Sequence, residues 1–264
     1  MIIKTNKVKR WISPIFWYPS SSKKKVERFQ KRIRDLEWDA IKHAIPSGGK
    51  FLDVGCGAGD NMLRAIMEFN CSCEGIDPDP GRHGVGRFNG LEMELPLTIQ
   101  KGVAEALPYE NSSFDVVFCS HVLEHVADEK ASLKEISRVL KPNGVLIIGM
   151  PTATVAAIAL FSSWVFTTHI SILFAIKSIG KPDFLKRLRR IFIPDSHSTP
   201  RGNNVFYDLK HYQTKKWEST VSEVFVIREK TYPALYPLPD FPWWFPPIKL
   251  RFTGSSVFFT ATKK

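Results

Sequence analysis

The sequence predicts an α/β protein built on a mostly parallel sheet, followed by an apolar helical insertion. Between Lys50 and Pro151, short apolar runs alternate with helical stretches, and the first run leads directly into a glycine-rich turn. Hydrophobic residues make up 44% and charged residues 24% of the 264 residues, a balance typical of a globular protein with a core. Because β–α alternation favours right-handed crossovers, we expect parallel strands.

The elements are expected in a definite order. A helix over Val26–Ile45 carries apolar side chains at helical spacing and ends before Pro46. Strands are expected at Phe51–Val54, Cys73–Ile76, Leu97–Gln100, Val116–Ser120 and Val145–Met150, with helices near Asp60–Phe69, His121–Val126 and Lys130–Leu140. A helix near Thr214–Val224 and strands near Phe225–Lys230 and Ser256–Thr262 complete the pattern.

The composition divides the chain into four expected regions. These are a basic aromatic arm (1–25), a core (26–151), a hydrophobic and basic insertion (152–204), and a C-terminal helix and two strands with a Pro- and Trp-rich insertion (205–264). Pro14 and Pro19 interrupt the only apolar stretch near the N-terminus, which disfavours a signal peptide. The four cysteines lack zinc-site spacing, so we expect reduced thiols in a cytoplasmic protein.

The strongest chemical signal is the run from Phe51 to Asp60, in which Gly55, Gly57 and Gly59 alternate after an apolar strand. Glycine permits positive φ and lets the backbone approach a ligand closely. The spacing is G-x-G-x-G, whereas the dinucleotide fingerprint is G-x-G-x-x-G. Asp53 at the strand end suits an ammonium group, and Asp77 at the end of the next strand suits the two hydroxyls of a ribose.

Together these motifs resemble the class I S-adenosylmethionine-dependent methyltransferases, of the methyltransferase type 11 group that includes ubiquinone-biosynthesis O-methyltransferases. The likeness covers residues 50–151 and continues through the segments 102–117, 121–126 and 138–151. It implies a Rossmann-like seven-stranded methyltransferase sheet, parallel with an antiparallel last strand. It also implies an enzyme that uses S-adenosyl-L-methionine.

The resemblance assigns roles to individual residues. Asp53, Gly55, Gly57 and Gly59 would hold the methionine end of the cofactor and Asp77 its ribose. Ala104 and Glu105 would lie along the adenine, and Cys56 and Ser120 are included in the same predicted cofactor site. The family often has Asp immediately before the Ala-Glu pair, where this chain has Val103, so Glu105 or a backbone carbonyl would have to replace it.

Two histidines after the fourth expected strand are the candidate catalytic residues, His121 and His125. Methyl transfer needs alignment above all, although a hydroxyl acceptor gains from a base. In the ubiquinone O-methyltransferases an E-x-x-E-H motif binds a divalent ion, and here His121, Glu124 and His125 occupy the matching positions. Metal binding at these three residues and a structural helix start are both left open.

The expected acceptor is a hydrophobic or lipid-linked small molecule. No Asn/Asp-Pro-Pro-aromatic signature or Pro-Cys nucleophile is present, so methylation of nucleic-acid bases is disfavoured and oxygen is preferred over carbon. Residues 152–176 are 25 residues without a formal charge, yet one membrane span there would separate the last strands from their sheet. A core helix, a lid and a segment dipping into one leaflet remain as alternatives.

The reaction is expected at a membrane surface, to which the protein attaches peripherally. The net charge of +11, the cationic stripe at 184–192 and the Trp-rich insertion at 241–245 fit peripheral contact with an anionic membrane. The alternatives are a soluble phenol or sugar methyltransferase with an apolar lid, and a non-catalytic cofactor-binding module. RNA methylation is disfavoured because the basic residues lie beside apolar ones.

Overall fold

The computed structural model describes residues 23–80, 97–162, 204–236 and 247–264, with isolated positions between 172 and 193. Its centre is a seven-stranded sheet in the order β3-β2-β1-β4-β5-β7-β6. Strands β1 to β5 pair in parallel and β7 runs antiparallel to both of its neighbours. The predicted Rossmann-like methyltransferase sheet with an antiparallel last strand is therefore confirmed.

The strands agree closely with the sequence-based expectations. Their bounds are β1 Lys50–Val54, β2 Ser72–Asp77, β3 Leu97–Lys101, β4 Phe114–Ser120, β5 Leu140–Pro151, β6 Phe225–Thr231 and β7 Ser256–Lys263. The order of strands reverses between β1 and β4, since β2 lies on one side of β1 and β5 on the far side of β4. In open α/β sheets, ligands bind outside the carboxyl ends of the strands at this switch point.

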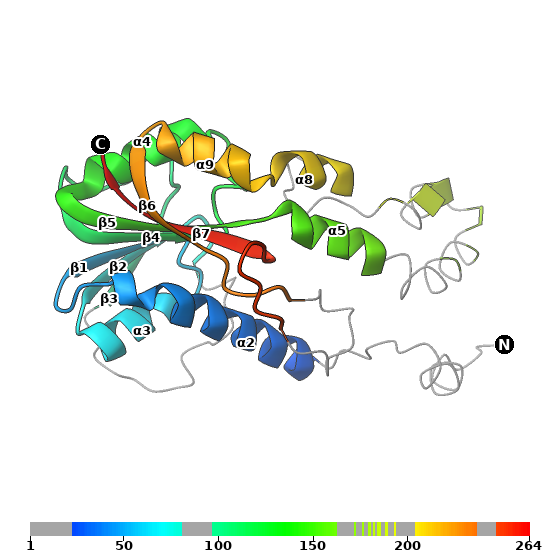
Figure 1. Cartoon of the computed structure of the whole chain (residues 1–264), viewed down its shortest axis with the longest axis horizontal. Coiled ribbons are helices and arrows are strands. Elements are labelled where there is room, and N and C mark those ends of the chain that lie inside the picture. The colour runs from blue at the N-terminus through cyan, green and yellow to red at the C-terminus, as the bar shows by residue number, and fades with distance from the viewer. Residues whose placement is uncertain are drawn as a thin grey trace.

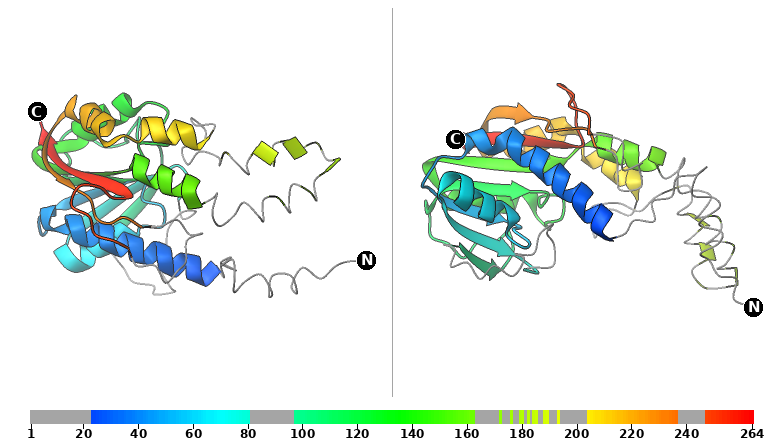
Figure 2. Two further views of the ribbon diagram at one scale, coloured as in Figure 1. Left: turned by 45° about the vertical axis from the view of Figure 1, so that its right-hand side comes forward. Right: turned by 90° about the horizontal axis from the view of Figure 1, so that it is seen from below.

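Helices cover both faces of the sheet (Figure 1). Their bounds are α2 Lys23–Ile41, the short 3₁₀ helix η1 Lys42–Ala44, α3 Asp60–Phe69, α4 Glu129–Val139, α5 Ala153–Ser162, α8 Val205–His211 and α9 Thr214–Ser222. Helices α2 and α3 lie on one face, and α4 and α9 on the other. Figure 2 shows α5 and α8 side by side beyond the sheet, and they pack against each other.

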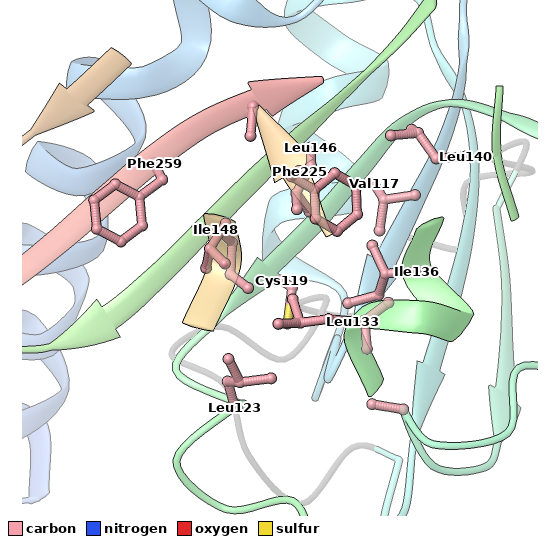
Figure 3. Packing of buried hydrophobic residues seen from close by; sticks show 14 of the residues in the cluster. Val117, Cys119, Leu123, Leu133, Ile136, Leu140, Leu146, Ile148, Phe225 and Phe259 are labelled. Atoms are coloured by element: carbon pink, nitrogen blue, oxygen red, sulfur yellow. The ribbon is translucent and has the colours of Figure 1, made fainter. Parts of the chain in front are cut away.

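Alternating side chains of the central strands build two hydrophobic cores, because successive residues of a strand face opposite sides. Phe51, Val116, Phe118, Ile147 and Phe258 pack with α2 and α3 in one core. Leu52, Val117, Leu146, Ile148 and Phe259 pack with α4 and α9 in the other, part of which is shown in Figure 3. Between these two layers, the carboxyl ends of the strands remain open for a ligand site.

One expected helix is absent. Residues 121–126 form turns instead, because His121 has φ of +57°, in the left-handed region that a right-handed helix excludes. The backbone amide of His121 donates to the carbonyl of Gly149 in β5 over 2.8 Å, which ties the residue to the sheet. Helix α4 starts later, where the carboxylate of Asp128 caps the amides of Lys130 and Ala131.

The insertion begins at the carboxyl end of β5, and helix α5 starts two residues after that strand ends. Helix α8, which the sequence did not predict, packs on α5. The amide of Ala153 in α5 donates to the carbonyl of Tyr212, which follows α8, over 2.8 Å. No helix in the described part of the chain combines the length and apolarity needed to cross a membrane. Residues 1–22 of the expected aromatic arm, the Trp-rich segment 241–245 and most of 163–203 lie outside the described residues, and α2 already begins at Lys23.

Candidate functional site

Three glycines build the turn that follows β1. Their φ angles are +76° at Gly55, +54° at Gly57 and +85° at Gly59, where a residue with a Cβ would be disfavoured by about 1–2 kcal/mol. The amides of Gly55 and Cys56 both donate to the carbonyl of Ile76, over 2.7 and 3.2 Å. The turn is therefore fixed to the end of β2, and the positive end of α3 faces it.

Asp53 brings a buried carboxyl group with an unsatisfied oxygen to this turn. Its side chain lies in β1 with only 2% of the residue exposed, and its Oδ2 atom has no hydrogen-bond partner. Burial raises the pKa of Asp53 well above its usual range, and the carboxylates of Asp77 and Asp60 add to this. A buried polar atom without a partner is costly and calls for an explanation. A ligand ammonium would supply both the missing hydrogen bond and the opposite charge.

Asp77 connects the glycine turn to the end of β2. Its Oδ2 atom accepts from the amide of Gly57 over 2.9 Å, and its Oδ1 atom accepts from the amide of Asp79 over 2.8 Å. A carboxylate oxygen has two lone pairs, so both atoms keep capacity for one further donor each. The residue fits hydroxyl groups of a nucleoside while also fixing the turn.

The segment after β3 carries the residues expected to lie along the adenine. Ala104 is buried and Val103 is 47% exposed. The Oε1 atom of Glu105 accepts from the amides of Ala127 and Asp128, over 2.7 and 3.5 Å. This carboxylate therefore fixes the segment leading into α4, and its contact with adenine stays a prediction.

Arg138 of α4 holds the same segment in place. Its guanidinium donates to the carbonyls of Leu107 and Tyr109, over 2.8 and 2.6 Å, and to the side chain of Asn111 over 3.0 Å. It also pairs with Glu135, whose carboxylate accepts from the amide of Leu107 over 2.9 Å. One planar cation thus orders the whole loop that follows β3.

The end of β4 lies directly on the glycine turn. A Cβ added at Gly55 would lie 2.2 Å from the Cγ2 atom of Val122, so only glycine allows the two segments to approach this closely. Ser120, the last residue of β4, is half-buried and pairs with Gly149 of β5. Cys56 is buried, and burial raises the pKa of its thiol, which disfavours a reactive thiolate.

A buried ionic cluster surrounds His121. We name it the Glu37 cluster, after the α2 carboxylate on which Arg34, His121, Tyr236 and Ser256 converge. The Oε1 atom of Glu37 accepts from Ser256 Oγ over 2.7 Å and from Tyr236 Oη over 3.1 Å, and it lies 3.1 Å from His121 Nε2. Its other oxygen pairs with Arg34. Four separate segments of the chain therefore meet at one carboxylate.

The electrostatics of this cluster favour charged groups. Burial acts to raise the pKa of Glu37, but Arg34 and His121 outweigh it and hold that pKa far below its usual range. Burial and Arg34 lower the pKa of His121, whereas Glu37 and Glu124 raise it, and the net direction is upward. The cluster is therefore an ion-paired assembly in which the imidazolium form of His121 is stabilised.

Glu124 completes the surroundings of His121. It is buried, its two oxygens have no hydrogen-bond partner, and its Oε1 atom lies 3.5 Å from His121 Nδ1 and 3.9 Å from His125 Nε2. Burial raises and the two histidines lower its pKa, with a net downward direction. Within the described ranges, no group of three or more His, Cys, Asp or Glu side chains is arranged to hold a metal ion. Metal binding at these residues therefore rests on sequence alone.

Sequence reasoning missed most of the Glu37 cluster. Arg34 and Glu37 belong to a helix with alternating charge and Tyr236 and Ser256 to distant segments, so no local motif connects them with His121. The available signal was the position of Glu37 between apolar Leu36 and Trp38, on a helix expected to pack against the core. A carboxylate on a packed helix face is buried only with partners.

Comparison with known proteins assigns a family to the central part of the chain. Residues 52–148 match the family model described as a methyltransferase domain. Residues 52–148 therefore form a methyltransferase domain. A ubiquinone biosynthesis O-methyltransferase from Azorhizobium caulinodans is 33% identical over 128 residues, covering 48% of this chain and 50% of that protein. One from Xanthomonas campestris is 32% identical over 145 residues, covering 54% and 59%.

Solved structures agree on the fold. A SAM-dependent methyltransferase from Thermotoga maritima superposes with a TM-score of 0.54 at 20% identity, covering 98% of this chain and 96% of its own. An S-adenosylmethionine-dependent methyltransferase from Mesorhizobium loti gives 0.52 at 16% identity, covering 86% and 98%. The chain spans about half the length of the curated relatives it matches.

Proposed function

We propose that this protein transfers a methyl group from S-adenosyl-L-methionine to a hydroxyl oxygen of a hydrophobic small molecule. The observation that carries the proposal is the unpartnered, buried carboxylate of Asp53 beside a left-handed glycine turn whose Gly57 amide is fixed by Asp77. Two carboxylates and a glycine turn in this order match an amino-acid end and a ribose on one ligand. Oxygen as the acceptor atom is supported by the relatives named ubiquinone biosynthesis O-methyltransferase.

The protein's contribution is mainly alignment. Asp53 and the glycine turn would hold the cofactor's methionine end, and Asp77 its ribose. When bound, S-adenosyl-L-methionine supplies an electrophilic methyl group on a sulfonium. An in-line displacement needs the acceptor oxygen fixed in position, and a hydroxyl acceptor also gains from a nearby base. His121 and His125, at the carboxyl end of β4, are the candidate catalytic residues.

Calorimetry with cofactor and product tests the proposal at the glycine turn. The wild-type chain should bind S-adenosyl-L-methionine and S-adenosyl-homocysteine, and Asp53→Asn should weaken both by tenfold or more, since a charged hydrogen bond contributes about 1.5–3 kcal/mol. Asp115→Asn is the matched control, because Asp115 lies near the amino end of β4 and pairs with Lys141. Absence of binding to either compound, with clear binding of NAD, would contradict the proposal.

The acceptor is tested with matched phenols. Transfer of a labelled methyl group should be faster to a catechol with a long prenyl tail than to the same catechol without one. Equal rates would favour the soluble phenol or sugar methyltransferase instead. Cofactor binding without transfer to any acceptor of a broad panel would favour a non-catalytic module. Repeating the transfer assay after dialysis against EDTA, with and without added Mg²⁺, tests whether a divalent metal is needed, a question that the sequence leaves open.

A membrane surface as the place of reaction is supported by exposed apolar side chains on α5, α8 and the insertion. Phe161 of α5 is 59% exposed and Phe206 of α8 is 51% exposed. The insertion adds further exposed apolar residues, namely Ile172, Ile176, Ile179, Leu185 and Leu188. Exposed apolar groups on a chain with a net charge of +11 suit an anionic lipid surface.

Sedimentation with vesicles separates a membrane-bound from a soluble enzyme. The wild-type chain should pellet with phosphatidylglycerol-containing vesicles, and the Phe161→Ser/Phe206→Ser double variant should bind about tenfold more weakly, because each aromatic ring buries apolar surface in the lipid. Met67→Ser is the control, since Met67 is 73% exposed on α3, away from α5 and α8. A wild-type chain that stays in the supernatant would contradict membrane attachment.

A further inference from the structure

The Glu37 carboxylate is more heavily contacted than packing of α2 requires. Helix α2 already buries Trp38 and Ile41 in the core against the sheet and α3. Removing a carboxylate from water costs several kcal/mol, and an apolar residue of the same size would often pack as well. Glu37 nevertheless lies 3% exposed with hydrogen-bond donors on both oxygens. The arrangement therefore does more than hold α2 on the sheet.

His121 is the partner whose conformation most needs outside support. Its φ of +57° lies in the left-handed region, which few residues with a Cβ adopt. The backbone is held by the bond from its amide to Gly149, and the ring by Glu37. Strained residues of this kind persist where neighbouring groups fix them, and they concentrate at functional sites.

Both ring nitrogens of His121 face carboxylates. Nε2 lies 3.1 Å from Glu37 Oε1, and Nδ1 lies 3.5 Å from Glu124 Oε1. An ionised carboxylate can only accept, so the hydrogen bond to Glu37 requires a proton on Nε2. Glu124 makes no hydrogen bond to the ring but lies at ion-pair distance from it. Arg34 on α2, His125 beside Glu124, and the hydroxyls of Tyr236 and Ser256 are the other charged or titratable and polar groups of this assembly. The ring is therefore held in one orientation between two buried carboxylates.

We propose that Glu37 is a positioning residue for methyl transfer, which holds the His121 ring in a fixed orientation beside the cofactor turn. This inference rests on the proposed function. The mechanical link is short, because Val122 follows His121 directly and its side chain packs onto Gly55. A shift of the His121 ring is therefore transmitted to the glycine turn within one residue.

Glu37→Gln tests the positioning role with a side chain of equal size. Glutamine has one acceptor oxygen where glutamate has two, so it cannot serve Arg34 and His121 together. We expect kcat to fall about tenfold or more while the affinity for S-adenosyl-homocysteine changes less than about threefold. Glu68→Gln is the matched control, since Glu68 accepts from Trp38 and Lys42 and so also supports the α2 region, but at a distance from His121. Equal loss of kcat in both variants would reduce Glu37 to a structural role.

A second variant tests whether Glu37 acts through His121. Asparagine tolerates left-handed backbone, so His121→Asn should fold without the imidazole ring that Glu37 holds. If Glu37 acts through that ring, Glu37→Gln should lower kcat by less than about threefold in the His121→Asn background, compared with about tenfold or more in the wild type. An undiminished loss in the His121→Asn background would overturn the positioning role.

Nuclear magnetic resonance gives a readout that needs no acceptor. In protein with ¹⁵N-labelled histidine, the Nε2 proton of His121 should be visible and protected from exchange with water, with His121→Asn providing its assignment. The signal should disappear in Glu37→Gln and persist in Glu68→Gln. A signal unaffected by Glu37→Gln would refute the proposal, even if no methyl acceptor is found; failure of cofactor binding would instead count against the proposed function alone.

Discussion

Ser256 donates to Glu37 through a 2.7 Å hydrogen bond that joins residues 219 positions apart in the chain. Ser256 is the first residue of β7 and Glu37 belongs to α2. The bond therefore fixes α2 to β7, which lies between β5 and the edge strand β6. Both side chains are buried. This contact places the carboxylate within reach of His121 and connects the C-terminal region with the candidate site.

Asp53→Asn is expected to stabilise the ligand-free protein while it weakens cofactor binding. Burial raises the pKa of Asp53 on folding, so between the unfolded and folded pKa values the folded chain binds more protons. Its contribution to stability therefore falls as pH rises above about 4, the usual value for Asp. Asparagine removes this penalty. The midpoint of thermal unfolding should rise relative to wild type, and more at pH 8 than at pH 4.5; a lower midpoint at both would contradict the prediction.

Gly55→Ala should destabilise the fold through two separate effects. The new Cβ would collide with Val122, and alanine would have to adopt a left-handed φ. We therefore expect the free energy of unfolding measured in urea to fall by about 2–5 kcal/mol. Val122→Ala should relieve the collision and leave the backbone strain. The double variant should therefore lose at least about 1 kcal/mol less than the two single losses added together. Simple additivity would show that the two residues do not touch.

Arg138→Ala should loosen the loop after β3. The carbonyls of Leu107 and Tyr109 would lose their donor, which costs about 1–3 kcal/mol of unfolding free energy. Arg138→Lys should not restore stability, because an ammonium cannot replace a planar guanidinium at several acceptors. Cofactor affinity should fall in both variants if the loop contacts adenine. Lys134→Ala, an exposed change on the same helix, serves as the comparison and should leave both measurements unchanged.

The ion pair of Glu37 and His121 predicts a pH dependence of stability. The raised pKa of His121 gives a contribution that is complete below about pH 6.5 and lost as pH rises through the folded value. The lowered pKa of Glu37 gives one that is present above about pH 4.3 and lost only as pH falls through its folded value. Urea unfolding should therefore show a larger advantage of wild type over His121→Asn at pH 5.5 than at pH 9. An advantage independent of pH would mean that the pKa of His121 is the same in the folded and unfolded states, which would contradict the prediction.

The sequence predicted the sheet well because each strand and helix has a local pattern of apolar residues. The strands from Phe51 to Met150 are apolar runs of strand length, and Asp60–Phe69 begins and ends as expected. The helix expected at 121–126 was wrong. The apolar spacing there is helical, but the backbone of His121 has a left-handed φ, which a right-handed helix excludes. Helix α8 was not predicted, since seven residues following a polar loop give little periodic signal.

The amino-acid sequence by itself determined the alternation of strands and helices, the glycine turn and the positions of Asp53 and Asp77, because strand, turn and acid lie close together along the chain. Only the tertiary structure decided the surroundings of His121. Glu37, Tyr236 and Ser256 reach it from remote segments, and nothing in their own neighbourhoods indicates the meeting. Local patterns depend on steric and hydrophobic preferences of adjacent residues, whereas a buried charge can be satisfied by any segment that the folded sheet brings beside it.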